Sequence, residues 1–398
     1  MNTGHAPTTS LGNPVRRYRA IVWGPGRMGS FALRTMLLRP DEFEIVGCFA
    51  YSPTKIGRDV GEIAAMAPAG VKATGNRDSI LATDADCVVF SAMTQLDPAK
   101  QAVLTRDVLD LLASGKNVVL AHDYFFPRGI SEQFAADVEA ACRQGRSTIF
   151  AGGTSPGFVC ERLATTIAGQ CLEVESIEVI ERMDITNHHY SVYPHMGLGL
   201  DPKNFPREKI IAMFGHFYRQ TPHAVAHTLG QRLQRVQVDA TFAVTERELT
   251  EVTGPVPRGS IAAMALTTTG FIDDRPFVTF TSRWVVDTQI PGWEVDNDWL
   301  ITVEGTPSVQ LNYKRGGSFA GGIRRGGDIH EQDGARYIDY QSLTTVATLI
   351  NAIPDTVAAA PGVLYPTIFG APRHRRSGRP LDTGTWLGDG RLANSRPG

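Results

Sequence analysis

The chain has 398 residues, of which 42% are hydrophobic and 20% charged, as expected for a globular protein of two ordinary domains. A formal net charge of −2 provides no strong field to attract nucleic acid or a membrane surface. The sequence contains no run of about 20 apolar residues, so no membrane-spanning helix is expected. Residues 1–17 are polar, lack the apolar run of a secretory signal, and are expected to form a disordered leader.

The first half of the chain alternates strand and helix patterns. Apolar runs predict strands, and apolar residues at helical spacing predict helices between them. The expected strands are Tyr18–Trp23, Phe43–Tyr51, Ala85–Ser91, Asn117–Ala121 and Ser147–Ala151, and the expected helices are Arg27–Leu38, Thr105–Ser114 and Ser131–Arg143. This alternation predicts a doubly wound parallel sheet with helices on both faces, a Rossmann domain over residues 18–157.

The pattern changes after Gly157 to long runs of alternating apolar and polar residues. These runs predict a mostly antiparallel sheet with one solvated face. The expected strands are Glu173–Ile185, Gln237–Val252, Ser260–Ile272, Pro276–Asp287, Asp298–Glu304 and Ser308–Lys314, with helices at Phe158–Ala168, Arg207–Tyr218 and Ala224–Leu233. We expect an α+β domain over residues 158–338 that binds the substrate and forms a dimer.

The last part of the chain contains a further helical pattern. A helix is predicted over Tyr340–Ile353 and is expected to stop at Pro354. The segment 339–372 is expected to return toward the Rossmann domain. The tail, residues 373–398, is rich in Arg, Gly and Pro and is expected to be extended or packed on a partner.

The turn after the first predicted strand has the spacing of a dinucleotide-binding site. Gly24, Gly26 and Gly29 form a GxGxxG pattern between a strand and a helix. The first glycine permits the tight turn, the second lets the backbone approach the pyrophosphate, and the third lets the helix pack on the strand. The helix N-terminus then offers N–H groups to the phosphates. The pattern therefore predicts a nicotinamide dinucleotide as cofactor.

The residues expected to contact this cofactor lie after successive strands of the predicted sheet. They are Gly24, Pro25, Gly26, Arg27, Met28, Gly29, Ser52, Lys55, Ser91, Ala92, Met93, Ala121, Thr154 and Pro156. NAD-selective sites place an acid at the end of the second strand, and here the strand ends without one. Ser52, Lys55 and Arg58 follow and are suited to a 2′-phosphate. NADP is therefore expected to be preferred, with NAD also possible.

Four motifs stand in order along the chain: GPGRMG at 24–29, YSPTKIGRDVG at 51–61, GKNVV at 115–119 and GTSPGF at 153–158. Together they resemble the motifs of the dihydrodipicolinate reductase-like oxidoreductases, in the branch of the 2,4-diaminopentanoate dehydrogenases and native amine dehydrogenases. The last differs from the branch's Gly-x-Asn-Pro-Gly-Phe turn because Ser155 stands in the Asn place. The resemblance implies hydride transfer between the nicotinamide and a carbon bearing an amine or imine.

The resemblance also implies a carboxylate after the GKNVV strand that holds the ammonium group and moves its proton. Asp123 stands where the family has Glu, and His122 precedes it. Asp is one methylene shorter, so a His/Asp pair that protonates a carbonyl oxygen is an alternative. Asp123 and His122 are the expected catalytic residues. Substrate contacts are expected from Tyr124, His188, His189 and Tyr190.

Metal chemistry is not expected. The five cysteines, Cys48, Cys87, Cys142, Cys160 and Cys171, are odd in number and include no CxxC pair, which argues against a disulfide framework or a zinc site. Such cysteines suit a reducing cytoplasm.

The expected function is an NAD(P)H-dependent oxidoreductase acting on a small amine or carbonyl, by reductive amination of a ketone or aldehyde. Two alternatives remain: an ammonia-independent carbonyl reductase and a non-catalytic NADP-binding regulator. A homodimer without nucleic-acid or membrane partners is expected.

Overall fold

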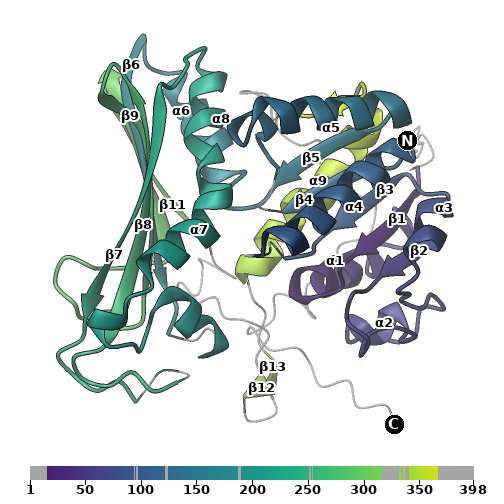
Figure 1. Ribbon diagram of the computed structural model, residues 1–398, viewed down its shortest axis with the longest axis horizontal. Coiled ribbons are helices and arrows are strands. Elements are labelled where there is room, and N and C mark those ends of the chain that lie inside the picture. Colours follow the sequence, from purple (N-terminus) through teal and green to yellow (C-terminus); the bar gives the residue numbers. More distant parts are fainter. Residues whose placement is uncertain are drawn as a thin grey trace, which may run out of the picture.

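A computed structural model describes residues 16–365 except 94, 96, 122, 123, 187–189, 251, 253, 316–330, 333, 334 and 337–339. Two sheets, each with its own helices, lie side by side (Figure 1). In the described part of the chain, no helix is both long and apolar enough to cross a membrane.

The first sheet has six strands and is parallel throughout. In chain order the strands are β1 (Tyr18–Trp23), β2 (Phe43–Phe49), β3 (Cys87–Phe90), β4 (Asn117–Ala121), β5 (Thr148–Gly152) and β14 (Gly362–Val363). Their spatial order is β14-β5-β4-β3-β1-β2, so the connections leave β1 in opposite directions. Open α/β sheets bind ligands at such a switch point, beyond the carboxyl ends of the strands.

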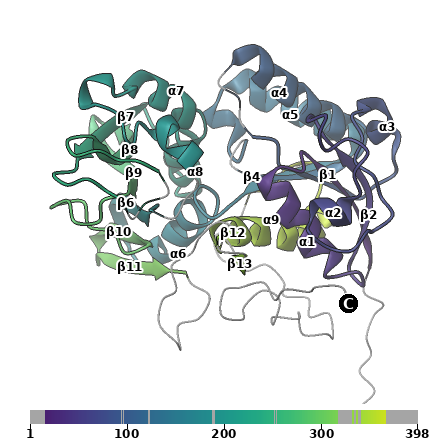
Figure 2. The same cartoon turned by 90° about the horizontal axis from the view of Figure 1, so that it is seen from below.

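Helices cover both faces of this sheet, with α4 and α5 on one face and α1 and α9 on the other (Figure 2). The elements are α1 (Arg27–Leu37), α2 (Val60–Ile63), α3 (Arg77–Ala82), α4 (Pro98–Ala113), the 3₁₀ helix η1 (Pro127–Gly129) and α5 (Glu132–Gly145). Side chains cap several helices: Asn76 caps α3, Asp97 caps α4 and Ser131 caps α5. The expected Rossmann architecture is confirmed.

The last helix corrects one prediction. α9 runs from Tyr340 to Ala358 and includes Pro354, where the sequence predicted a stop. Proline removes one N–H donor from a helix, which usually ends it. Here Leu349 and Ile353 of α9 are fully buried in the core of the first domain. Their packing keeps the helix on that domain and outweighs the cost of the hydrogen bond lost at Pro354.

The second sheet also has six strands, in the order β11-β10-β6-β9-β8-β7. They are β6 (Glu173–Asp184), β7 (Arg235–Val244), β8 (Ile261–Ile272), β9 (Arg275–Val285), β10 (Asp298–Thr306) and β11 (Val309–Lys314). β6 and β9 are parallel and the other neighbours are antiparallel. The mostly antiparallel α+β domain is therefore confirmed.

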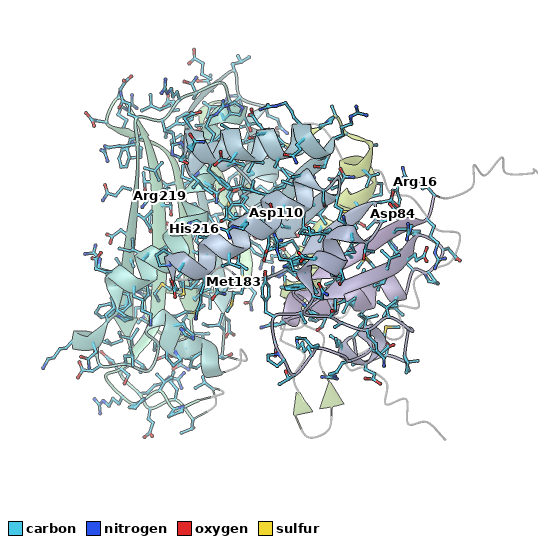
Figure 3. All side chains as sticks on the ribbon, turned by 45° about the vertical axis from the view of Figure 1, so that its right-hand side comes forward. Arg16, Asp84, Asp110, Met183, His216 and Arg219 are labelled. Carbon is cyan, nitrogen blue, oxygen red and sulfur yellow. The ribbon has the colours of Figure 1, made fainter. Side chains whose placement is uncertain are left out.

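Helices lie between this sheet and the first domain (Figures 1 and 2). They include α6 (Thr165–Ala168), α7 (Arg207–Tyr218) and α8 (Gln220–Thr228). The domain also contains the π-helix η2 (Val159–Ala164) and the 3₁₀ helices η3 (Tyr190–Met196) and η4 (Pro202–Asn204). Two short strands, β12 (Glu331–Gln332) and β13 (Ala335–Arg336), pair with each other. The core occupies the helix-covered side of the sheet, where Ile177, Val179 and Met183 of β6 are buried. Figure 3 labels Met183, with His216 and Arg219 in the helical layer.

Several further element boundaries differ from prediction. The helix expected over Thr105–Ser114 begins at Pro98 as α4, and the helix expected over Ala224–Leu233 is α8, which ends at Thr228. The helix expected over Phe158–Ala168 is wound as a π-helix before it becomes α6. The strand expected over Gln237–Val252 ends at Val244. Apolar periodicity reports which side of an element is buried, but it does not fix the hydrogen-bond pattern or the end of pairing.

Candidate functional site

The glycine turn joins β1 directly to α1 and is tightly packed against the residue that follows β3. Gly24 has a φ of +86°, and a Cβ added to it would lie 2.9 Å from the Ala92 backbone nitrogen. A Cβ added to Gly29 would lie 2.4 Å from the Gly24 carbonyl oxygen. Side chains are therefore excluded at both positions, the first by conformation and contact and the second by contact alone.

Gly26, by contrast, faces open space. A Cβ added there would meet no atom within 4 Å. Gly26 is the N-cap of α1 and provides no side-chain cap, and no acidic residue stands in the first turn of the helix. The N–H groups and the positive end of the helix dipole are thus available to an anion. This cradle fits the pyrophosphate of a dinucleotide.

Neighbouring side chains brace the turn. The Ser91 hydroxyl donates to the Gly24 carbonyl oxygen at 2.8 Å. The Lys55 ammonium donates to the Pro25 carbonyl oxygen, which brings a cation beside the turn. Burial, and then the nearby Arg58 charge, lower the pKa of Lys55. Ser52 is exposed in the same loop after β2, and its hydroxyl shares a 2.8 Å hydrogen bond with Thr54 Oγ1.

The loop after β4 is held from two sides. Its predicted catalytic residues, His122 and Asp123, lie outside the described residues. Tyr124 follows with a φ of +59°, and its buried hydroxyl accepts from Gln101 Nε2 at 2.9 Å and lies 2.7 Å from Thr105 Oγ1. Both partners belong to α4. The hydroxyl of Tyr124 is thus engaged in fixing the loop.

The second domain holds the same loop at its other end. The Phe126 N–H donates to Gln220 Oε1 of α8 at 3.0 Å, and Gln220 is completely buried. The aromatic ring of Phe126 also lies 5.3 Å from the His227 ring of α8. The described part of the loop, from Tyr124 to Phe126, therefore contacts both domains.

The turn after β5 forms the passage from one domain to the other. The Thr154 hydroxyl lies 2.9 Å from Thr344 Oγ1 of α9, and the Ser155–Pro156 peptide bond is cis. The Gly157 N–H donates to a carboxylate oxygen of Glu161 at 2.6 Å.

Glu161 was not predicted from the sequence. It lies in the π-helix, 8% exposed, and its second oxygen accepts from Thr221 Oγ1 of α8 at 2.6 Å. Burial raises the pKa of Glu161. A single acid in a helical pattern carries no spacing signal, so only the structure reveals that Glu161 links the interdomain turn to α8.

The remaining predicted residues are distributed as follows. Ala121 ends β4, Met93 is 79% exposed after β3, and Tyr190 begins η3. His188 and His189 lie outside the described residues. Among the described residues, no group of three or more His, Cys, Asp or Glu side chains is arranged to hold a metal ion.

Comparison with known proteins finds a family model that matches most of the second domain. Residues 158–326 match the family described as the 2,4-diaminopentanoate dehydrogenase C-terminal domain. An amine dehydrogenase from Streptomyces virginiae is 23% identical over 355 residues, covering 86% of this chain and 93% of that protein. A 2,4-diaminopentanoate dehydrogenase from Acetoanaerobium sticklandii is 20% identical over 359 residues, covering 88% and 92%.

A solved structure shares the fold over nearly its whole length. The amine dehydrogenase from Mycobacterium smegmatis superposes with a TM-score of 0.70 at 18% identity, covering 91% of this chain and 98% of that one. The resemblance inferred from the motifs is confirmed: the chain is similar to the 2,4-diaminopentanoate dehydrogenase and amine dehydrogenase branch along most of its length.

Proposed function

We propose that this chain is an NAD(P)-dependent amine dehydrogenase, which transfers hydride between a nicotinamide and a carbon bearing an amine or imine. The observation that carries the proposal is that one chain contains both a glycine turn suited to a dinucleotide and a second domain similar to that of the 2,4-diaminopentanoate dehydrogenases. Rossmann domains serve many reactions, so the second domain is what points to amines. A bound nicotinamide would supply the hydride chemistry, and the protein would orient the substrate and handle protons.

The preferred cofactor is NADP in this proposal. Ala50 and Tyr51 follow β2 where NAD-selective sites have an acid. Ser52 and Lys55 then offer a hydroxyl and a cation beside the turn, and Lys55 already contacts the Pro25 carbonyl oxygen. NAD is the alternative cofactor.

Asp123 is proposed as the residue that holds the substrate ammonium and exchanges its proton, with His122 as its neighbour. In sequence it stands two residues after the end of β4, and open α/β sheets bind ligands beyond the carboxyl ends of their strands. Tyr124 and Phe126 anchor the same loop to α4 and α8. Tyr124 is therefore proposed as a residue that positions the loop, while His188, His189 and Tyr190 remain proposed substrate contacts.

The shorter Asp in place of the family's Glu is the specific observation in favour of a second candidate, ammonia-independent carbonyl reduction by a His/Asp pair. The relatives do not favour that reaction or a non-catalytic regulator. Nothing in the fold is specific to either alternative.

A homodimer is proposed through the outer face of the second sheet, on the side away from α7 and α8 (Figure 1). Thr267 and Thr281 are paired on that face, and Ile180 stands beside them in the sheet register. The five free cysteines, four of them buried, suit the proposed cytoplasmic location.

The Asp123→Asn variant tests the catalytic assignment. It is expected to lose about a hundredfold or more in kcat, because general acid–base groups contribute on that scale. The dissociation constant for NADPH should stay within about twofold, because the change leaves the glycine turn intact. Asp84→Asn, at a surface acid whose side chain is 89% exposed, is the matched control. Full turnover by Asp123→Asn would refute the assignment.

A further inference from the structure

Tyr51 is an aromatic residue left exposed at the place where NAD-selective sites have an acid. It follows β2, and 44% of it is exposed although its neighbours Phe49 and Ala50 are buried. Trp23, directly before Gly24, pairs with Phe49 in the parallel register of β1 and β2. Tyr51 therefore lies on the edge of the sheet next to the glycine turn.

The hydroxyl of Tyr51 is fixed from two sides. It accepts from Trp23 Nε1 at 2.8 Å and donates to Asp107 Oδ2 at 2.5 Å. The other oxygen of Asp107 accepts from Arg77 Nε at 2.7 Å, and Arg77 also pairs with Asp110, which Figure 3 labels. Asp107 is 2% exposed. These bonds connect Tyr51 to the last residue of β1, the first residue of α3 and the interior of α4.

The orientation of the ring is also fixed by packing. Tyr51 meets Phe49 edge-on, with ring centroids 4.9 Å apart and planes at 90°. Phe49 in turn stacks on Trp23 at 4.1 Å. Burial, followed by the hydrogen bond to Asp107, raises the pKa of Tyr51 well above its usual range, so the phenol stays a donor. The hydroxyl is thus bonded to the buried side chains of Trp23 and Asp107, while 44% of the residue is exposed.

We propose that the exposed ring of Tyr51 is the platform on which the adenine base of the dinucleotide stacks, and that Asp107 positions it. The inference rests on the proposed function, because it needs a dinucleotide on the glycine turn. The adenosine half of a dinucleotide lies at the end of the second strand in such folds, and adenine has a flat face that a rigid aromatic ring binds at low entropic cost. Because the hydroxyl is committed to Trp23 and Asp107, Tyr51 does not distinguish NAD from NADP.

Binding measurements with cofactor fragments test this assignment. Isothermal titration of Tyr51→Leu and Tyr51→Phe is made with NADPH, NADH, adenosine 2′,5′-bisphosphate and reduced nicotinamide mononucleotide. The leucine variant is expected to bind the three adenine ligands about tenfold or more weakly, because stacking on one ring is worth that much. Its affinity for the mononucleotide, which lacks adenine, should not change. The phenylalanine variant keeps the ring and should stay within about threefold of the wild type.

Asp107 is tested by rescue. Asp107→Ala removes the acceptor of the Tyr51 hydroxyl and should weaken only the adenine ligands, and Asp107→Asn, which retains an acceptor oxygen, should restore part of the affinity. Equal adenine affinity in Tyr51→Leu and wild type would overturn the proposal, as would an equal loss for the mononucleotide. If the adenine ligands bind through Tyr51 but no substrate is turned over, the proposed function fails and the platform stands. If the wild type turns over substrate and Tyr51→Leu binds the adenine ligands as tightly as the wild type, the platform proposal fails and the proposed function stands.

Discussion

At the scale of single residues, glycines in the GxGxxG turn can be needed for packing or for the approach of a ligand, and the sequence pattern alone does not distinguish these two reasons. Gly29 is required by the fold, because a Cβ there would meet the Gly24 carbonyl oxygen at 2.4 Å. Gly26 is not required by the fold, because the space beside it is open and its φ of −71° suits any residue. In the proposed function, glycine is needed at position 26 so that the pyrophosphate can approach the backbone.

Gly26→Ala and Gly29→Ala should therefore have opposite effects. Gly26→Ala is expected to weaken NADPH binding about tenfold or more, since the methyl group occupies the approach of the pyrophosphate. It should leave the free energy of unfolding within about 0.5 kcal/mol. Gly29→Ala is expected to lower the unfolding free energy by roughly 1–3 kcal/mol. Urea unfolding and cofactor titration measure both, and normal cofactor affinity in a folded Gly26→Ala protein would contradict this account.

A second residue-scale feature is the buried acid Glu181 on β6. It is 2% exposed and accepts a hydrogen bond from Ser282 Oγ. Burial raises its pKa to about 7, and the nearby Arg315 charge opposes part of that rise. Between pH 4.5 and pH 7 the unfolded chain releases the proton and the folded protein keeps it, so stability falls as the pH rises.

This decline is predicted to reach about 3 kcal/mol by pH 7 and to change little above it. The glutamine in Glu181→Gln cannot ionise, so this variant should lack the decline in unfolding free energy. Its stability relative to the wild type should therefore be higher at pH 8 than at pH 5. Glu178→Gln, an exposed acid on the same strand, is the control. Urea unfolding at the two pH values decides the matter, and an equal decline in wild type and Glu181→Gln would rule out this role.

At the scale of elements, periodicity located most helices and strands because burial follows period 3.6 in helices and period 2 in strands. The ranges Arg207–Tyr218 and Asn117–Ala121 were predicted to the residue. Failures occurred where tertiary packing decides: α9 continues through Pro354, and the two-residue strand β14 pairs with β5 without a strand pattern of its own. Short pairing of this kind depends on where the rest of the chain brings the segment.

The packing of α9 can be measured with two leucines. Leu349 is completely buried in the first domain's core, whereas Leu172 is 90% exposed. Leu349→Ala should cost about 2–5 kcal/mol of unfolding free energy through lost burial and the cavity left behind. Leu172→Ala should stay within about 0.5 kcal/mol. Similar costs for the two variants in urea unfolding would mean that α9 is not part of the domain core.

At the scale of the whole molecule, the candidate site depends on contacts between the domains that the sequence did not reveal. The dinucleotide turn was predictable because its requirements are local. The hydrogen bond between Phe126 and Gln220 was not predictable, because these residues are 94 positions apart in the sequence. The partnership of Glu161 with Thr221 was likewise invisible, since a single acid carries no spacing signal. Asp123 and His122 remain predictions.

Gln220→Leu should loosen the loop that contains Asp123. The Phe126 N–H would lose its acceptor, at a cost of about 1–3 kcal/mol in stability. We expect kcat to fall more than NADPH affinity, because the glycine turn lies on other elements. Gln231→Leu, at an exposed glutamine after α8, is the control. An unchanged kcat together with the expected loss of stability would restrict Gln220 to a structural role.

The central claim is amine chemistry with a nicotinamide cofactor, and one assay tests it most directly. NADPH and NADH oxidation is followed with a panel of ketones and aldehydes, with and without a high concentration of ammonium. The account predicts oxidation that requires ammonium and yields the amine. Oxidation that is indifferent to ammonium would assign the chain to carbonyl reduction, and absence of oxidation under both conditions, with cofactor still bound, would favour a binding protein over an enzyme.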